Sequence, residues 1–308
     1  MMLRLIKNLF NYYGIEIKRF AKGENNFEWL YSDSINTIID IGAHIGKYSI
    51  IQRKKYPNAI IYAFEPLHDA YFQLISHFED DPNFFAKNVA LGNENKTIDF
   101  IKSSRKSSSS VLHLAGSHKS AFPDSAIETT QKIEMMRLDD YFINSERQIK
   151  KDLIIKIDVQ GYEYEIIKHG KEKIKNSLVI QLETSPIPLY KNEKSSSEVI
   201  NQLEKLGFSL HMFNKVNTKP FKPMKINNSI YQGLHHLFQL DCVMINNFQN
   251  IDSFSKEDLT KLILIMFYSF KSYDFVDYLI KIMDKKFNLN LIEKYRKLGS
   301  SFKILKKY

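Results

Sequence analysis

The segment DIGAHIG, residues 40–46, places two glycines between a β-branched run and a helical pattern. We expect Gly42 to let the backbone approach a ligand and Gly46 to let the helix pack closely on the strand. The amides that begin the helix carry a partial positive charge, which suits a carboxylate or a phosphate. The spacing matches neither the G-x-G-x-x-G turn nor the P-loop. By itself the turn is compatible with phosphate, a dinucleotide, another adenosine compound or no ligand.

Two carboxylates narrow this choice. Asp40 stands directly before the turn, where its charge would repel a pyrophosphate and attract a cationic amino group. Glu65 ends the next predicted strand, 25 residues later, where a carboxylate can accept both hydroxyl groups of a ribose. A ligand with an adenosine, an amino group and a carboxylate, but no phosphate, is S-adenosylmethionine. The charges therefore favour this cofactor.

A repeating strand–helix pattern positions these residues. The predicted strands cover residues 35–41, 59–64, 84–91, 97–102, 133–138, 153–159, 178–184, 210–213 and 242–245, and the main helices end near residue 56, cover 67–78, end at Gly170 and cover 198–206. Such alternation predicts a doubly wound α/β sheet, which binds ligands outside the carboxyl ends of its strands. The residues that follow strands are therefore the candidates: Asp40 to Gly46, Glu65, Asn88, Asp158 and Glu183.

The chain is predicted to have three parts: an N-terminal helical segment (1–34), an α/β domain (35–247) and a C-terminal helical appendage (248–308). Residues 1–22 form an amphipathic pattern, typical of a packing helix or of a membrane-surface anchor. In the appendage, Ser255 resembles a helix cap, and the apolar side chains after it share one helical face. These side chains are Leu259, Leu262, Ile263 and Met266.

Composition limits the other possibilities. The 308 residues include one cysteine, Cys242, so no internal disulfide can form, which fits a reducing compartment. No apolar run approaches the ~18 residues that span a bilayer. The net charge is +9, but the sequence contains no stripe of basic residues interleaved with aromatic residues, so we expect no nucleic-acid partner. We predict a cytoplasmic protein, with peripheral contact to the inner face of the membrane through the basic termini as an alternative.

A set of ordered segments resembles the FkbM family of S-adenosylmethionine-dependent methyltransferases over residues 35–246. They are DIGAHIGKYS (40–49), FEP (64–66), NVALG (88–92), the serine run before Val111, LDD (138–140) and IKIDVQGYE (155–163). The resemblance implies a class I, Rossmann-like methyltransferase fold. It also implies methyl transfer, most often to an oxygen of a sugar or natural product.

The same resemblance implies a role for individual positions. It assigns the methionine part of the cofactor to Asp40, Gly42, Ala43 and Gly46, the ribose to Glu65, the flanks of the adenine to Asn88 and Val89, and a further cofactor contact to Ser109 and Ser110. His44 stands where the family commonly has asparagine. We expect it either to offer a polar group to the cofactor or to cap the following helix.

Asp158 and Glu183 are the predicted catalytic residues, each at the end of a strand, and Asp158 is also a predicted cofactor contact. A sugar hydroxyl has a high pKa, so a base must take its proton as the new bond forms. A divalent metal on Asp158, Glu163 and Glu183 could acidify the hydroxyl instead, but we expect no metal. For Glu163 the alternative to a metal ligand is a structural role, because it stands near a predicted helix N-terminus, where the helix dipole stabilises a carboxylate. His211, His235 and His236 are read as ordinary loop or packing residues rather than as bases or ligands.

The acceptor is predicted to be a small molecule or saccharide: a sugar hydroxyl of a glycan, glycolipid or natural product. Its specificity is expected in three irregular stretches, 103–126, 185–197 and 214–240. A nicotinamide-dependent oxidoreductase is the first alternative, disfavoured by Asp40 and by the missing glycine motif. A non-catalytic methyltransferase-like binding module is the second, disfavoured by the presence of Glu65 and Asp158.

Overall fold

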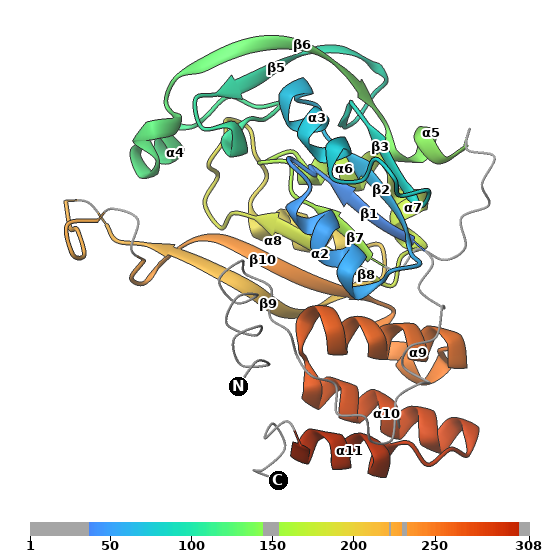
Figure 1. The fold of residues 1–308 in the computed structure, drawn as a ribbon. Helices are drawn as coiled ribbons and strands as arrows, with labels where there is room; N and C mark the ends of the chain where they lie inside the picture. The colour runs from blue at the N-terminus through green and yellow to red at the C-terminus, as the bar shows by residue number, and fades with distance from the viewer. Residues whose placement is uncertain (1–36, 144–153, 222, 230–232, 302–308) are drawn as a thin grey trace, which may run out of the picture. The chain divides into compact units, whose positions relative to one another are not determined.

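A buried parallel strand, β1 (Thr37–Ile41), lies at the centre of the fold, and all five of its residues are inaccessible or nearly so. The computed structural model describes residues 37–143, 154–221, 223–229 and 233–301 (Figure 1). β1 pairs in parallel with the next strand along the chain on one side and with β7 (Ile154–Ile157) on the other. A strand buried on both faces is typical of a parallel sheet with helices on each side.

Seven strands form the main sheet, and only β10 runs against its neighbours. In spatial order they are β3 (Phe84–Lys87), β2 (Ile60–Phe64), β1, β7 (Ile154–Ile157), β8 (Val179–Thr184), β10 (His236–Asn246) and β9 (Phe208–Lys219). The topology switches between β1 and β7, because the chain first builds outward from β1 through β2 to β3 and then returns to the other side.

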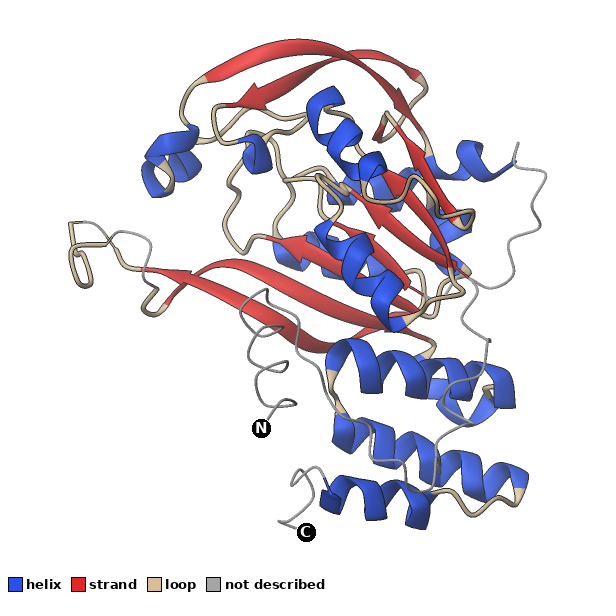
Figure 2. Ribbon diagram, viewed as in Figure 1, coloured by secondary structure: helices blue, strands red, loops and turns tan. Residues whose placement is uncertain are grey.

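Helices cover both faces of this sheet (Figure 2). α2 (Lys47–Lys55) and α3 (His68–Ser76) lie on one face, where Leu74 packs with Ala63. The other face carries α5 (Leu138–Ile143), α6 (Glu163–His169), α7 (Lys171–Lys175) and α8 (Ser196–Glu204). Ile39 and Ile41 of β1 join that second core cluster, so the intervening Asp40 faces α2. The predicted α/β sheet is confirmed.

A second, three-stranded sheet lies between β3 and β7 in the sequence. It consists of β4 (Ala90–Leu91), β6 (Glu128–Met136) and β5 (Lys96–Ser103). The single strand predicted for residues 84–91 is therefore wrong: it divides at Asn88, and its two halves join different sheets. The predicted loop 103–126 contains η2 (Lys106–Ser108), α4 (Gly116–Ala121) and η3 (Pro123–Ser125).

β9 and β10 form a long antiparallel hairpin, far longer than the predicted strands 210–213 and 242–245. The expected irregular stretch 214–240 is accordingly wrong at both ends, because residues 214–219 and 236–240 are strand. Four of the polar residues that interrupt the apolar runs lie on one face of these strands: Lys215 and Asn217 of β9, and Asp241 and Gln239 of β10.

The C-terminal residues form η4 (Phe248–Ser253), α9 (Lys256–Ile265), the π-helical η5 (Met266–Phe270), α10 (Tyr273–Phe287) and α11 (Ile292–Ser301). Ser255 caps α9, accepting from the Asp258 amide at 3.0 Å, and the predicted apolar face is buried. Tyr56 and Ser269 bond at 2.8 Å between the hydroxyls, which joins this part to the end of α2. The three-part division stays a prediction, and residues 1–34 lie outside the described residues.

Candidate functional site

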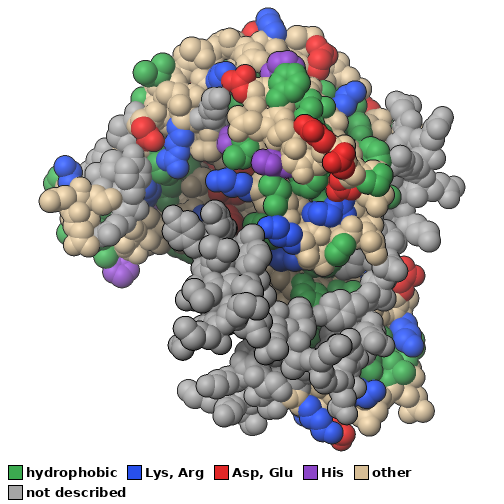
Figure 3. Space-filling model, in the orientation of Figure 1, with side chains coloured by type: hydrophobic (Ala, Val, Ile, Leu, Met, Phe, Trp, Pro, Cys, Tyr) green, Lys and Arg blue, Asp and Glu red, His purple; other side chains and the backbone are tan. Residues whose placement is uncertain are grey.

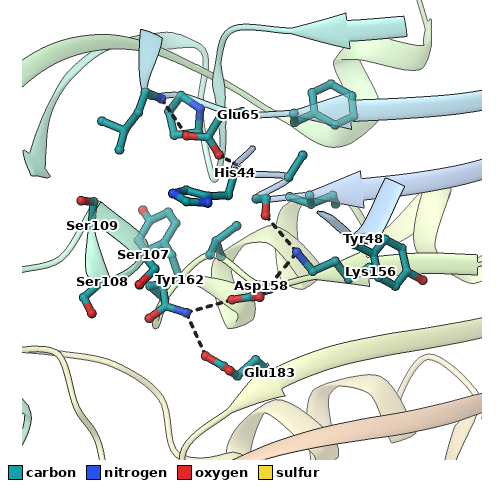
Figure 4. Close-up of a pocket in the computed structure, with 18 of the residues that line it drawn as sticks. His44, Tyr48, Glu65, Ser107, Ser108, Ser109, Lys156, Asp158, Tyr162 and Glu183 are labelled. Atoms are coloured by element: carbon teal, nitrogen blue, oxygen red, sulfur yellow. Dashed lines mark hydrogen bonds and ion pairs between the residues drawn. The ribbon is translucent and has the colours of Figure 1, made fainter. Parts of the chain in front are cut away.

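A cavity of about 810 Å³ opens at the carboxyl ends of β1, β2, β7 and β8, where the topology switches. Figure 4 shows Glu65 at one end, Glu183 at the other, and His44 and Asp158 between them. On the face drawn in Figure 3, lysine and arginine side chains gather around a hollow. The cavity therefore occupies the place where the sequence predicts a ligand.

The turn after β1 is fixed by contacts of its own backbone. Gly42 has φ +75°, and a Cβ there would lie 1.9 Å from the carbonyl oxygen of Asp158. The amides of Gly42 and Ala43 both donate to the Phe64 carbonyl at 3.0 Å. Gly42 and Ala43 line the cavity, but the close approach that requires glycine is to the end of β7 and not to a ligand. Our interpretation of Gly42 is corrected accordingly.

Gly46 serves packing between helices. Its φ is +85°, and a Cβ would lie 2.8 Å from Leu74 Cδ1 in α3. The expected close contact of helix and strand is therefore a contact of α2 with α3. Gly46 does not line the cavity, so its predicted contact with the cofactor stays a prediction that this geometry does not favour.

Glu65 is 4% exposed and lines the cavity at the end of β2. Its Oε2 accepts from the His44 amide at 2.8 Å and its Oε1 from the Leu67 amide at 2.9 Å. Burial raises the pKa of the carboxyl to about 7, although these amides oppose the shift. Each carboxylate oxygen has a second lone pair, so both can still accept a hydroxyl.

Asn88 holds the turn that carries Glu65. Its Nδ2 donates to the carbonyls of Glu65 at 2.8 Å and Pro66 at 3.0 Å. Asn88 does not line the cavity, whereas Val89 does. The adenine contact predicted for Asn88 stays a prediction, and the structure gives this residue a supporting position.

A buried ion pair, absent from the sequence predictions, joins β1 and β7. Lys156 Nζ lies 3.3 Å from Asp40 Oδ1 and 3.5 Å from Asp158 Oδ2, and donates to the Gly42 carbonyl at 2.9 Å. Burial lowers the pKa of this ammonium, but the two carboxylates raise it more, so it lies above its usual value. Ser49 Oγ also donates to Asp40 Oδ2 at 2.7 Å.

This ion pair corrects our interpretation of Asp40. The carboxylate is fully buried, does not line the cavity, and is compensated by Lys156, so its charge does not face a ligand's amino group. Lys156 itself does line the cavity. The signal was available: a lysine inside the buried run LIIKIDV is costly unless it is paired.

Gln160 connects the two predicted catalytic carboxylates. Its Nε2 lies 2.8 Å from Asp158 Oδ1 and 2.8 Å from Glu183 Oε1. Its backbone has φ +61°, and its Oε1 accepts from the hydroxyl of Tyr190 at 2.8 Å. Gln239 Nε2 donates to the same Glu183 Oε1 at 2.8 Å. The structure thus brings Asp158 and Glu183 together through an amide that sequence reasoning missed.

Glu183 is an unusual carboxyl group. Burial, reinforced by the nearby Asp158 and Asp241 charges, raises its pKa well above the ordinary value. Both amide donors bind Oε1, and among the described residues no hydrogen-bond donor contacts Oε2. Oε2 is therefore available to a group in the cavity.

Glu163 does not join these carboxylates. It is buried, and it accepts from the backbone amides of Val159 at 3.0 Å and Gly161 at 3.0 Å, which fixes the turn after β7. The structural alternative for Glu163 is the one observed. Among the residues that the structure describes, no group of three or more His, Cys, Asp or Glu side chains could hold a metal ion.

The two serines of the predicted cofactor segment differ. Ser109 lines the cavity and accepts from the Ser103 amide at 3.1 Å. Ser110 lies outside the cavity lining and donates to the Gln160 carbonyl at 2.7 Å. Ser110 thus supports the turn of Gln160, and its predicted contact with the cofactor stays a prediction.

The histidines occupy different environments. His44 lines the cavity, but the cap of α2 is Gly46 with no side-chain bond, so the predicted capping role of His44 is wrong. His211 bonds the Ser272 hydroxyl at 2.9 Å, and His236 stacks on Phe221 with 4.4 Å between ring centroids. These two and His235 do not line the cavity.

The strand order, with β10 reversed between β8 and β9, and the acidic residue at the end of β2 define the class I fold of S-adenosylmethionine-dependent methyltransferases. The donor set fits the cofactor, since Glu65 retains lone pairs for two hydroxyls. A model of the Methyltransferase FkbM domain matches residues 40–210. The chain belongs to this family and is an S-adenosylmethionine-dependent methyltransferase.

Two relatives and one solved structure illustrate the similarity. The chain is 27% identical to the 2-O-methyltransferase NoeI of Sinorhizobium fredii over 172 residues, which cover 54% of this chain and 70% of the relative. It is 25% identical to Methyltransferase 1 of Beauveria bassiana over 142 residues, 42% of this chain and 57%, less than two thirds, of that protein. A TehB-like methyltransferase from Corynebacterium glutamicum has a TM-score of 0.35 at 8% identity, covering 79% and 96% of the two chains.

The family match removes the nicotinamide-dependent oxidoreductase as an alternative. In the part of the chain that the structure describes, no helix has both the length and the apolar character to cross a membrane. The location and the partners predicted from the sequence stay predictions.

Proposed function

We propose that this methyltransferase methylates a hydroxyl oxygen of a saccharide, with Glu183 as the proton acceptor. The observation that carries the proposal is the bonding of Glu183, which lines the cavity: Oε1 accepts from two amide groups, while Oε2 has no hydrogen-bond donor among the described residues. A base with a raised pKa is a stronger proton acceptor once it is ionised. The relative named a 2-O-methyltransferase supports oxygen as the acceptor atom.

Different residues of the cavity would hold the cofactor and the acceptor. When bound, the cofactor supplies an electrophilic methyl group on a sulfonium and departs as a neutral thioether. Glu65 would hold the ribose, and the wall formed by Gly42, Ala43 and His44 would hold the methionine part. Asp158 would accept a hydrogen bond from the acceptor hydroxyl and orient it. Glu183 Oε2 would receive its proton as the new oxygen–carbon bond forms.

The cavity wall beside Glu183 supports a saccharide as the acceptor. This wall contains both amide and carboxylate side chains. Amides donate and accept hydrogen bonds, as sugar hydroxyls do. A glycan, a glycolipid headgroup or a glycosylated natural product would each present such hydroxyls.

The test is methyl transfer to an array of saccharides, with radioactive methyl on S-adenosylmethionine. We expect label in a product that withstands mild alkali, because a methyl ether is stable there and a methyl ester is not. Label found only on nitrogen or in an alkali-labile ester would refute the proposal.

Variants then test the two carboxylates. Glu183→Gln should lower turnover by about 10²–10⁴-fold with unchanged affinity for S-adenosylhomocysteine, since it removes the base and not the cofactor site. Asp158→Ala should also act mainly on turnover. Turnover within twofold of the wild type in Glu183→Gln would assign the proton to another group.

A further inference from the structure

One wall of the cavity is a polar face of three adjacent strands. Each strand contributes two residues spaced by two, so both side chains point to the same side. All of them line the cavity: Gln181 and Glu183 from β8, Gln239 and Asp241 from β10, and Lys215 and Asn217 from β9.

The strand register places five of these side chains in two rows across the sheet, whereas Gln181 lies opposite Val243, on the other side of the row that contains Glu183. Asp241 lies opposite Glu183 on one side and opposite Lys215 on the other. Asn217 lies opposite Gln239. Neighbouring strands are about 4.8 Å apart, so the first row extends about 10 Å from Glu183 to Lys215. This is longer than a single pyranose ring.

The two faces of these three strands differ in polarity. On the opposite face of the same strands, Leu182, Leu240 and Cys242 are buried in the core with α8. Among the described residues, the side chains of Gln181, Lys215 and Asn217 form no recorded hydrogen bond. Their bonding capacity is available to a ligand.

The chemistry of the face matches hydroxyl groups. Gln181, Gln239 and Asn217 are amides, which donate and accept at once. One cation, Lys215, stands opposite one carboxyl, Asp241, whose pKa is raised by burial and by Asp158. The face has neither the cationic cluster that a phosphate needs nor the apolar surface that an acyl chain needs.

We infer that this polar face is a second saccharide subsite, which holds the sugar unit next to the one that is methylated. The acceptor is then a chain of at least two glycosidically linked sugars rather than a monosaccharide. This inference rests on the proposed function, because Glu183 marks both the reacting hydroxyl and the start of the face.

The experiment measures binding separately from methyl transfer. Mono-, di- and trisaccharides with a common terminal sugar, drawn from hexoses, deoxyhexoses and amino sugars, are titrated by saturation-transfer NMR against the full chain with S-adenosylhomocysteine bound. For the sugars that bind, we expect the trisaccharide to bind about tenfold more tightly than the terminal monosaccharide. The double variant Lys215→Ala/Asn217→Ala should remove this difference.

The matched control is Val216→Ala, which lies between Lys215 and Asn217 on β9 and opposite the core residue Leu240. Its side chain therefore belongs to the other face, and the gain with chain length should persist. Equal binding of mono- and trisaccharides, a gain that survives the double variant, or no binding of any saccharide would each overturn the inference.

Methyl transfer to the same saccharides separates the two proposals. Methylation of mono- and trisaccharides without any gain in binding would leave the proposed function standing and remove the subsite. Length-dependent binding that the double variant abolishes, without methylation of any saccharide, would support the subsite and remove the function.

Discussion

Backbone contacts fix the cavity wall beside β1 and β2, whereas side chains from three paired strands form the wall beside β8, β10 and β9. In the first region, Gly42, Ala43 and His44 donate their amides to Phe64 or Glu65. In the second, the contact is between side chains, since Gln239 of β10 donates to Glu183 of β8. A region held by its own backbone tolerates little change, and a region of open side chains can change its ligand while the fold persists.

The largest expected effect tests the rigidity of the first region. Gly42→Ala should lower the free energy of unfolding by about 3 kcal/mol or more, because the backbone is left-handed and the added carbon meets the Asp158 carbonyl at 1.9 Å. Urea unfolding measures this loss. Gly116→Ala is the matched control, since a Cβ there meets nothing within 4 Å. Equal stability of the two variants would mean that the turn is not rigid.

The second prediction concerns the ion pair between the two regions. Lys156→Met should cost about 3 kcal/mol in unfolding free energy, because it leaves the carboxylate of Asp40 buried without its cation. Adding Asp40→Asn should recover part of that loss. Lys215→Met removes an exposed lysine of the second region and should change stability by less than about 0.5 kcal/mol. If Lys156→Met is as mild as Lys215→Met, the pair does not support the turn.

The same contrast explains which parts the sequence predicts. Each of the segments DIGAHIG, FEP and KIDVQGYE is one continuous stretch of the chain, so its residue types and spacing can be recognised from the sequence. The buried parallel strands follow from unbroken β-branched runs. The compensation of Asp40 by Lys156 needs the parallel pairing of β1 with β7, which joins residues far apart in the chain.

The second region escaped prediction for a related reason. In β9 and β10, polar residues on one face interrupt the apolar run, so the sequence shows short strands where the structure has a long hairpin. The alternation in FQLDCV, residues 238–243, is the signal that would have revealed both the strand and its polar face. The break at Asn88 had a weaker signal, because apolar runs stand close to it on both sides: FFA, residues 84–86, and VAL, residues 89–91.

The third prediction uses pH to test the cofactor end. Hydroxyl donors bind the ionised form of Glu65, whose pKa is about 7 without ligand. Affinity for S-adenosylhomocysteine should therefore be constant above about pH 8 and fall by up to about tenfold per pH unit below 7. Calorimetry measures the slope. Glu65→Gln should bind more weakly and without this slope. If the slope survives in that variant, another group is responsible.

The smallest expected effect tests whether the acceptor end depends on support from outside the cavity. Tyr190 does not line the cavity, but its hydroxyl donates to Gln160 Oε1 at 2.8 Å, and Gln160 holds both Asp158 and Glu183. Tyr190→Phe removes that bond, worth about 1 kcal/mol, and leaves the amide of Gln160 less well oriented. Turnover should fall severalfold with little change in KM or in cofactor affinity, because only the alignment of the carboxylates is affected.

Tyr278→Phe is the control for this last variant, since Tyr278 lies in α10, is 51% exposed and does not line the cavity. A purely structural role for Tyr190 would lower stability and the amount of active enzyme, yet leave the turnover of the folded fraction unchanged. A fall in turnover at unchanged stability would instead identify Tyr190 as a positioning residue. The acceptor end would then depend on the same kind of fixed geometry that the backbone provides beside β1 and β2.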